Sequence, residues 1–121
     1  MKTLRVGIAS YKDMKARTMA IARGEYKPGK DEPQIWFTSA ESFAKVLSDK
    51  NRALLDLIAG SEPASMAELV EKTGRKKSNL SRTLKTMEQY GLVKLNKAEK
   101  GRIAPRVPYQ NIALMVPIRA H

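Results

Sequence analysis

Residues 65–91 read SMAELVEKTGRKKSNLSRTLKTMEQYG, and this stretch decides the predicted fold. It opens with Ser65-Met66-Ala67-Glu68, a capping box in which a hydroxyl and a carboxylate satisfy free N–H groups at the start of a helix. The helix should end at Thr73-Gly74, because glycine readily adopts the left-handed conformation that closes a helix. Its buried face should consist of Met66, Leu69 and Val70.

A second helix is predicted directly after this glycine. Leu80, Leu84 and Met87 are spaced i, i+4 and i+7, so they lie on one face of a helix. Tyr90-Gly91 marks its end. The two helices are therefore short and joined by a tight turn.

The apolar pattern then changes from helical spacing to alternation. Residues 92–95 predict a strand, residues 96–101 a polar hairpin tip, and residues 102–107 a returning strand. Pro105 and Pro108 confine the returning strand to a sheet edge or shorten it. Two helices joined by a tight turn form a helix-turn-helix, and a hairpin after the second helix predicts the winged form.

The polar residues of the second helix face away from its apolar side. Arg and Asn can make paired hydrogen bonds to guanine and adenine, whereas Ser, Lys and a helix N-terminus suit phosphates. An amphipathic helix without a partner would carry both Lys and Glu, but residues 72–87 contain six basic groups and no acid. We therefore expect the helix to enter the major groove of double-stranded DNA through Arg75, Lys76, Lys77, Ser78, Asn79, Ser81, Arg82 and Lys85.

The predicted hairpin offers a second basic surface. Lys94, Lys97, Lys100 and Arg102 lie around its tip, near Gly101. A basic hairpin beside a recognition helix can reach the neighbouring minor groove or phosphates. Lys97, Lys100 and Arg102 are the expected DNA contacts of this wing.

The net charge of +11 is unevenly distributed along the 121 residues. Residues 41–70 carry 3 basic and 5 acidic groups, whereas residues 71–121 carry 12 basic and 3 acidic groups. A polyanion is the simplest partner for such a surface. The alternative is a solvated basic face with no specific partner. An anionic membrane is disfavoured, because the basic residues do not back onto a broad apolar stripe of one long helix.

The first part of the chain has a different pattern. Residues 4–8 alternate apolar groups and predict a strand, and residues 11–23 predict a helix closed at Gly24. Residues 25–33 contain prolines and glycine among charges and predict a loop. Residues 35–37 are apolar and β-prone.

The predicted domain boundary follows residue 37, where Thr38-Ser39-Ala40-Glu41 fits another capping box. Further apolar positions give two helical faces and a last strand: Phe43, Val46 and Leu47; Leu54, Leu55, Leu57 and Ile58, closed by Gly60 and Pro63; and residues 112–116. The sequence therefore predicts an α+β fold, with an N-terminal strand/helix arm in residues 1–37 and a winged helix-turn-helix DNA-binding domain in residues 38–121.

The apolar residues of the arm need something to pack against. Three arrangements compete: packing on the same chain, exchange with a second protomer, and docking of a protein partner. We expect a homodimer to which the arm contributes, because helix-turn-helix proteins commonly bind two half-sites of a palindromic operator. Trp36 is either buried at that interface or a core aromatic of one protomer.

The sequence argues against catalysis, a cofactor and a metal site. There is no Cys, and the single His is residue 121, which disfavours thiol chemistry, zinc sites and His-based triads. The acids of residues 41–70 suit helix starts and solvent faces rather than a converging carboxylate pair. Residues 27–30, KPGK, lack the pattern of a phosphate-binding loop.

A cytoplasmic location is expected, with no membrane partner. No apolar run approaches the ~20 residues that cross a bilayer. Met1-Lys2-Thr3-Leu4-Arg5 also lacks the apolar core of a signal peptide.

The stretch 54–93 resembles the winged helix-turn-helix of bacterial transcriptional regulators of the MarR/ArsR type. The matching pieces are Ala67-Glu68-Leu69, Thr73-Gly74, Ser78-Asn79-Leu80-Ser81-Arg82 and Glu88-Gln89-Tyr90-Gly91-Leu92-Val93. This resemblance implies a DNA-binding regulator.

A second resemblance covers more of the chain and is to small helix-turn-helix antitoxins of toxin–antitoxin operons. It is carried by Ala22-Arg23-Gly24-Glu25, Pro33, Trp36-Phe37-Thr38-Ser39, Thr73-Gly74-Arg75 and Ser78-Asn79. It implies a repressor of its own operon whose arm binds a small protein toxin or completes the dimer. The alternatives are a general winged-helix regulator without a toxin and a non-specific nucleic-acid-binding protein.

Overall fold

The computed structural model describes residues 2–118, and His121 lies outside them. The described residues form two compact units: unit 1 comprises residues 2–45 and 111–118, and unit 2 comprises residues 46–110. This division differs from the expected boundary after residue 37. The reason is the last strand, which pairs with the first strand of the chain and so belongs to unit 1.

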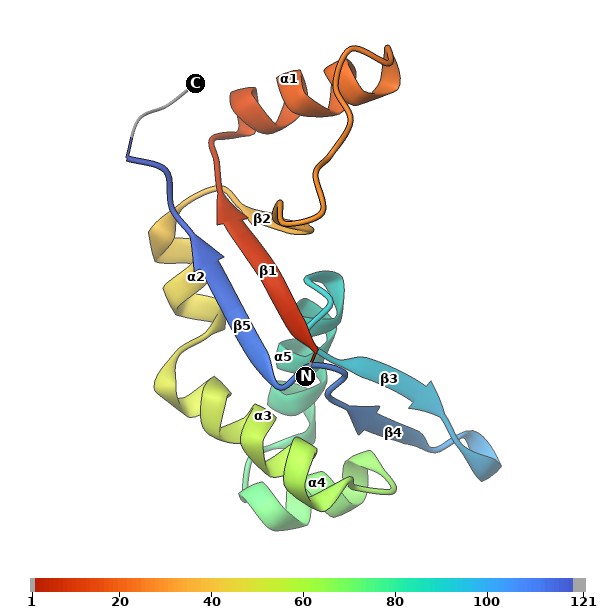
Figure 1. Cartoon of the computed structure of the whole chain (residues 1–121). Coiled ribbons are helices and arrows are strands. Elements are labelled where there is room, and N and C mark those ends of the chain that lie inside the picture. Colours follow the sequence, from red (N-terminus) through yellow and green to blue (C-terminus); the bar gives the residue numbers. More distant parts are fainter. Residues whose placement is uncertain (1, 119–121) are drawn as a thin grey trace. The chain divides into compact units, whose positions relative to one another are not determined.

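Unit 1 is built on a three-stranded parallel sheet in the order β2-β1-β5 (Figure 1). The strands are β1 (Thr3–Ile8), β2 (Ile35–Phe37) and β5 (Asn111–Met115). Each lies where the sequence predicts a strand. Leu4, Val6 and Phe37 are fully buried, as the alternation of the first strand predicts for Leu4 and Val6.

Two helices complete unit 1: α1 (Tyr11–Ala22) and α2 (Ala40–Val46), whose last residue opens unit 2. The predicted glycine after the first helix is confirmed, since Gly24 has a φ of 75°. The predicted pairing of Thr38 with Glu41 is wrong. Ser39 Oγ accepts from Ser42 N at 3.0 Å, and Ser42 Oγ accepts from Ser39 N at 3.3 Å, so two serines form the box one residue later.

Trp36 packs on its own chain. A Cβ on Gly7 would lie 2.5 Å from Trp36 Cζ3, so the ring rests where Gly7 leaves space. The guanidinium of Arg17 lies 5.2 Å from the Trp36 ring centroid and 5.7 Å from that of Tyr26. Arg17 also pairs with Glu32 at 2.8 Å. These contacts join α1, the following loop and β2.

Unit 2 contains the predicted winged helix-turn-helix, which confirms the α+β fold. Its elements are α3 (Asp49–Ser61), α4 (Met66–Thr73), α5 (Lys77–Gln89), β3 (Lys94–Lys97), a short 3₁₀ helix (Glu99–Gly101) and β4 (Ile103–Arg106). Strands β3 and β4 pair antiparallel, with Lys97 opposite Ile103 (Figure 1). The core is formed by Leu54, Ile58, Leu69, Leu80, Leu84, Met87, Leu92 and Val93.

Three details of unit 2 differ from expectation. The strand expected at residues 92–95 is Lys94–Lys97, and Leu92 and Val93 before it are both buried. Gly60 does not close α3 but lies inside it, and the helix ends in left-handed Glu62, with a φ of 44°, before Pro63. On α4 only Leu69 is fully buried, whereas Met66 and Val70 are half-buried. An eight-residue helix turns a narrow face inward, so its flanking apolar residues stay partly exposed.

Two glycines give a matched test of the helix ends. Gly74 closes α4 with a φ of 71°, so Gly74→Ala should lower the free energy of unfolding by about 1–2 kcal/mol, the cost of a left-handed Cβ. Gly60 is helical, and a Cβ added there would meet no other heavy atom within 4 Å outside its own helix backbone. Gly60→Ala should therefore raise the free energy of unfolding by about 0.5–1 kcal/mol. Urea unfolding of both variants measures these values. Equal effects of the two substitutions would contradict the assigned ends.

Candidate nucleic-acid interface

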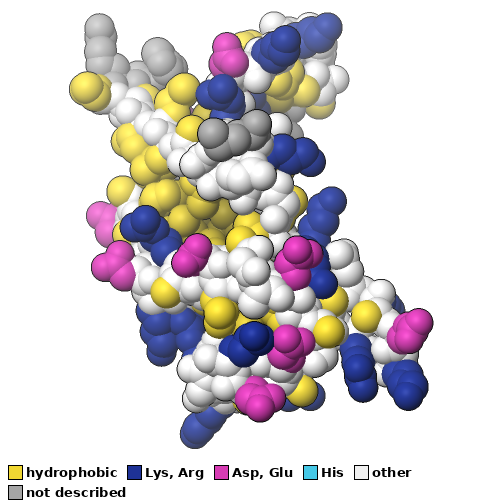
Figure 2. All heavy atoms as spheres, turned by 60° about the horizontal axis from the view of Figure 1, so that its bottom comes forward, with side chains coloured by type: hydrophobic (Ala, Val, Ile, Leu, Met, Phe, Trp, Pro, Cys, Tyr) yellow, Lys and Arg dark blue, Asp and Glu magenta, His cyan; other side chains and the backbone are white. Residues whose placement is uncertain are grey.

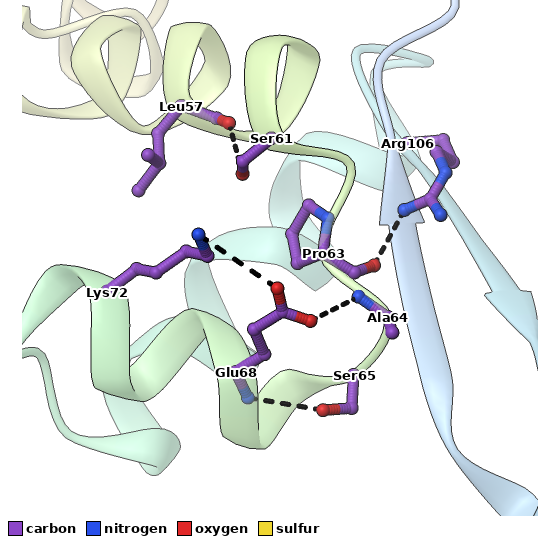
Figure 3. Close-up of polar contacts among 8 residues, drawn as sticks. All are labelled: Leu57, Ser61, Pro63, Ala64, Ser65, Glu68, Lys72 and Arg106. Carbon is purple, nitrogen blue, oxygen red and sulfur yellow. Dashed lines mark hydrogen bonds and ion pairs between the residues drawn. The ribbon is translucent and has the colours of Figure 1, made fainter.

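The turn between α3 and α4 is fixed by backbone hydrogen bonds to side chains (Figure 3). Ser65 Oγ accepts from Glu68 N at 3.1 Å, which confirms half of the predicted capping box. Glu68 reaches back to Ala64 N at 2.7 Å rather than to Ser65 N, so the box closes one residue earlier than expected. Lys72 Nζ lies 4.0 Å from the other carboxylate oxygen of Glu68. This arrangement fixes where the first helix of the helix-turn-helix begins.

Arg106 connects the hairpin to the same turn (Figure 3). Its Nη1 donates to Pro63 O and to Pro105 O, both at 2.7 Å. Its Nε lies 3.5 Å from Glu62 Oε2. The guanidinium therefore binds β4 to the end of α3 and holds the base of the hairpin beside the helix-turn-helix. The sequence alone does not predict this role, because Arg106 and Pro63 are 43 residues apart and no local pattern relates them.

Arg75, a predicted DNA contact, is engaged within its own chain. Its Nη2 donates to Lys50 O at 3.0 Å, and its Nη1 lies 3.4 Å from Asn51 Oδ1. Asn51 in turn donates to Val46 O at 3.1 Å. The half-buried Arg75 side chain thus connects the turn before α5 to the start of α3.

The buried face of α5 determines which residues face solvent. Leu80, Leu84 and Met87 are fully buried, as predicted. At 3.6 residues per turn the opposite side of the helix is formed by residues spaced i, i+4, i+7 and i+11. These are Ser78, Arg82, Lys85 and Gln89, all exposed, and we call them the α5 outer stripe.

The other predicted contacts of this region surround the outer stripe. Lys76, Lys77 and Asn79 are exposed, and Ser81 is half-buried beside the core face. Lys76 is the N-cap of α5 and makes no side-chain cap hydrogen bond, whereas Ser10, Ser48 and Ser65 cap α1, α3 and α4. The first turn of α5 is therefore basic and carries no acidic residue.

The hairpin places its charged side chains at an exposed tip. Lys97, Lys100 and Arg102 are all exposed, as is Glu99 between them, and Figure 2 shows basic and acidic side chains together on the projecting hairpin. Lys100 has a φ of 59°, which a side chain adopts at a cost of about 1–2 kcal/mol. Ala98 N donates to Arg102 O at 2.6 Å and closes the turn.

The hairpin is also fastened to α5. Glu88 Oε2 accepts from Leu95 N at 3.3 Å, which ties the last turn of the helix to β3. The outer stripe and the hairpin tip thus belong to one unit with defined connections.

The searched part of the chain, residues 2–118, contains no group of three or more metal-ligating side chains. Within these residues no helix is long and apolar enough to cross a membrane.

The contacts of Arg75 can be tested by stability. Arg75→Ala removes two hydrogen bonds and should lower the free energy of unfolding by about 1 kcal/mol. The neighbouring exposed Lys76 is the matched control, and Lys76→Ala should change the free energy of unfolding by less than about 0.5 kcal/mol. Chemical unfolding without nucleic acid measures both. If Arg75→Ala were as stable as Lys76→Ala, the contacts of Arg75 would not hold the turn.

Comparisons with known proteins give one structural and one family match. The crystal structure of a predicted DNA-binding transcriptional regulator from E. coli matches with a TM-score of 0.48 and 24% sequence identity, over 78% of this chain and 84% of that chain. No curated protein matches the chain. The HVO_A0114 family model matches residues 46–114, from the first residue of unit 2 into β5 and over more than half of the chain. The chain belongs to the HVO_A0114 family.

Proposed function

We propose that this protein is a sequence-specific, double-stranded-DNA-binding transcriptional repressor that acts as a homodimer on a palindromic operator. The observation that carries the proposal is the α5 outer stripe, which lies opposite the fully buried face of the same helix. A helix inserted into the major groove must expose a polar face that is free of its own core. The α5 outer stripe meets this requirement and includes two basic side chains.

The residues of this region divide into two roles. Arg82, at the middle of the outer stripe, reads a base edge, for which a guanidinium provides paired donors. Asn79 reads a neighbouring base. Lys76, Lys77 and Ser78 at the start of α5 contact phosphates, since a helix N-terminus presents free N–H groups to an anion. Lys85, one turn beyond Arg82, contacts the phosphate backbone.

Arg75 has a different role in this proposal. Because its guanidinium is bound to Lys50 and Asn51, it positions the turn and therefore the first turn of α5. Its effect on DNA binding then comes through the orientation of the helix.

The reading role of Arg82 predicts a loss of specificity. Arg82→Ala should weaken binding to the preferred duplex by about 1–3 kcal/mol and relax the preference at one base pair. Lys12→Ala is the control, because it removes an exposed positive charge from α1 of unit 1. Titration of labelled duplexes that carry single base-pair changes measures the affinity and the base preference of both variants. An equal loss for specific and non-specific duplexes would make Arg82 a phosphate contact instead.

The wing contributes affinity without reading sequence. Lys100→Gly keeps the left-handed turn possible while removing a charge, so it should weaken binding to all duplexes and reduce the salt slope by about one unit. Glu99→Gln, which removes a negative charge from the same tip, should not weaken binding. Affinity measured over a range of salt concentrations gives the slopes. An unchanged slope for Lys100→Gly would remove the wing from the binding surface.

We further propose that the protein is an antitoxin that neutralises a small protein toxin and represses its own operon. The resemblance of pieces of residues 22–79 to small antitoxins supports this role, as does the presence of a separate unit 1 in addition to the winged helix-turn-helix. Co-expression with the product of the adjacent gene, followed by purification, tests it. Separate elution of the two proteins, with no rescue of growth, would leave a general winged-helix regulator.

The remaining alternative is non-specific nucleic-acid binding. Proteins of that kind commonly expose aromatic side chains for stacking, but residues 75–89 contain none. Equal affinity for duplex DNA and single-stranded RNA would favour this alternative.

A further inference from the structure

Strand β5 is apolar but exposed. Its sequence is Asn-Ile-Ala-Leu-Met, and four of these five residues are exposed. Leu114 is 42% exposed, Met115 54% and Val116 52%. Strands of parallel sheets are normally buried on both faces, so this composition and this exposure do not match in a single chain.

The exposed residues lie on both faces of the sheet. Leu114 is opposite Val6 in the parallel register, whereas Met115 is opposite Gly7, and successive side chains of a strand point to opposite faces. The exposed apolar side chains therefore lie along β5 on both faces of the sheet, and not on one face alone. One side of β5 pairs with β1, and within residues 2–118 no strand pairs with the other side.

The two edges of this sheet differ in protection. β2, at the opposite edge, has three residues and follows Pro33 and the charged residues 30–32. Short length, proline and charge are the usual means by which proteins prevent pairing at a sheet edge. Around β5, residues 107–118 contain no charged side chain, although 29% of the whole chain is charged. The β5 edge therefore has no charged side chain to prevent pairing, and its nearest prolines, Pro108 and Pro117, lie on either side of the strand rather than in it.

We propose that the β5 edge pairs with β5 of a second copy of this chain, forming a continuous six-stranded sheet across a two-fold axis. Two strands related by such an axis run antiparallel and are self-complementary, as an isologous interface requires. An axis at Leu114 places the small Ala113 opposite the long Met115 of the partner subunit, and Ile112 opposite Val116 of the partner subunit. Each apolar side chain then meets an apolar neighbour.

The absence of charge along this edge fits a second copy as the occupant. The chain carries a net charge of +11, so two copies repel each other where their basic side chains meet. The uncharged residues 107–118 are where two copies can approach without desolvating a like charge. This inference rests on unit 1 alone and does not require that unit 2 bind DNA.

Cysteine cross-linking tests the proposed register. Residues directly opposite in an antiparallel pair have Cβ atoms about 4.5–5.5 Å apart, within reach of a disulfide after a small adjustment. The chain has no native Cys, so Leu114→Cys provides a single thiol per chain. Mild oxidation should convert this variant to a covalent dimer on a non-reducing gel.

Met19→Cys is the matched control, because Met19 is 43% exposed and lies on α1 of the same unit. It should remain monomeric on the gel under the same oxidation. A Leu114→Cys variant that cross-links no faster than Met19→Cys would overturn the proposed pairing.

A charge substitution supplies a second readout. Leu114→Lys with Met115→Lys places like charges on the edge and should convert the dimer to a monomer in sedimentation equilibrium, with thermal unfolding still cooperative. Ile103→Lys, at an exposed residue of β4 in unit 2, should leave the dimer intact. A monomeric wild-type protein, or a double-lysine variant that stays dimeric, would overturn the inference.

Binding of both forms to a single half-site duplex separates this inference from the proposed function. If neither the wild-type protein nor the double-lysine variant binds any duplex, the DNA-binding proposal fails while the dimer stands. If both bind the half-site and the wild-type protein is monomeric, the β5 proposal fails while DNA binding stands.

Discussion

The burial of Leu80, Leu84 and Met87 is the constraint on which the rest of unit 2 depends. Deleting one such fully buried side chain typically costs about 2–5 kcal/mol, so α5 cannot rotate about its axis without a large loss of stability. With that face fixed, Arg82 and Lys85 must lie on the opposite side. The helix therefore has one orientation, and its polar surface is a direct consequence of its core.

Fixing the rotation of α5 does not by itself fix its neighbours. Arg75 ties the turn before α5 to the start of α3, and Arg106 ties the hairpin to the end of α3. Each guanidinium binds backbone carbonyl oxygens, which hold their positions better than flexible side chains do. Two arginines that count toward the basic charge thus act inside unit 2, and the surface proposed to meet DNA consists of the remaining exposed residues.

Local patterns were sufficient to predict most elements. The i, i+4, i+7 spacing of α5 and the serine cap of α4 depend on neighbours in the sequence, and the structure confirms them. A hairpin after Gly91 is also confirmed, although its first strand begins at Lys94 rather than at residue 92. Where two local partners compete, the pattern fails: Ser42 replaced Glu41 in the box before α2, because the helix begins one residue later than Thr38 requires.

Contacts between distant segments could not be predicted in this way. The last strand could be recognised as a strand, but its parallel pairing with β1 joins opposite ends of the chain and changes the division into units. For the site, exposure along α5 followed from its periodicity. The engagement of Arg75 did not, because its partners Lys50 and Asn51 lie on another helix. A basic residue next to a predicted recognition helix looks the same in sequence whether it faces solvent or its own chain.

Backbone amide chemical shifts, recorded while the protein is titrated with a duplex that carries its preferred site, provide the decisive measurement. The proposed interface predicts the largest changes in residues 76–85 and 97–102, with smaller ones at the buried face of α5. Changes confined to unit 1, or spread evenly over all basic segments, would contradict the assignment of the α5 outer stripe as the DNA-reading surface.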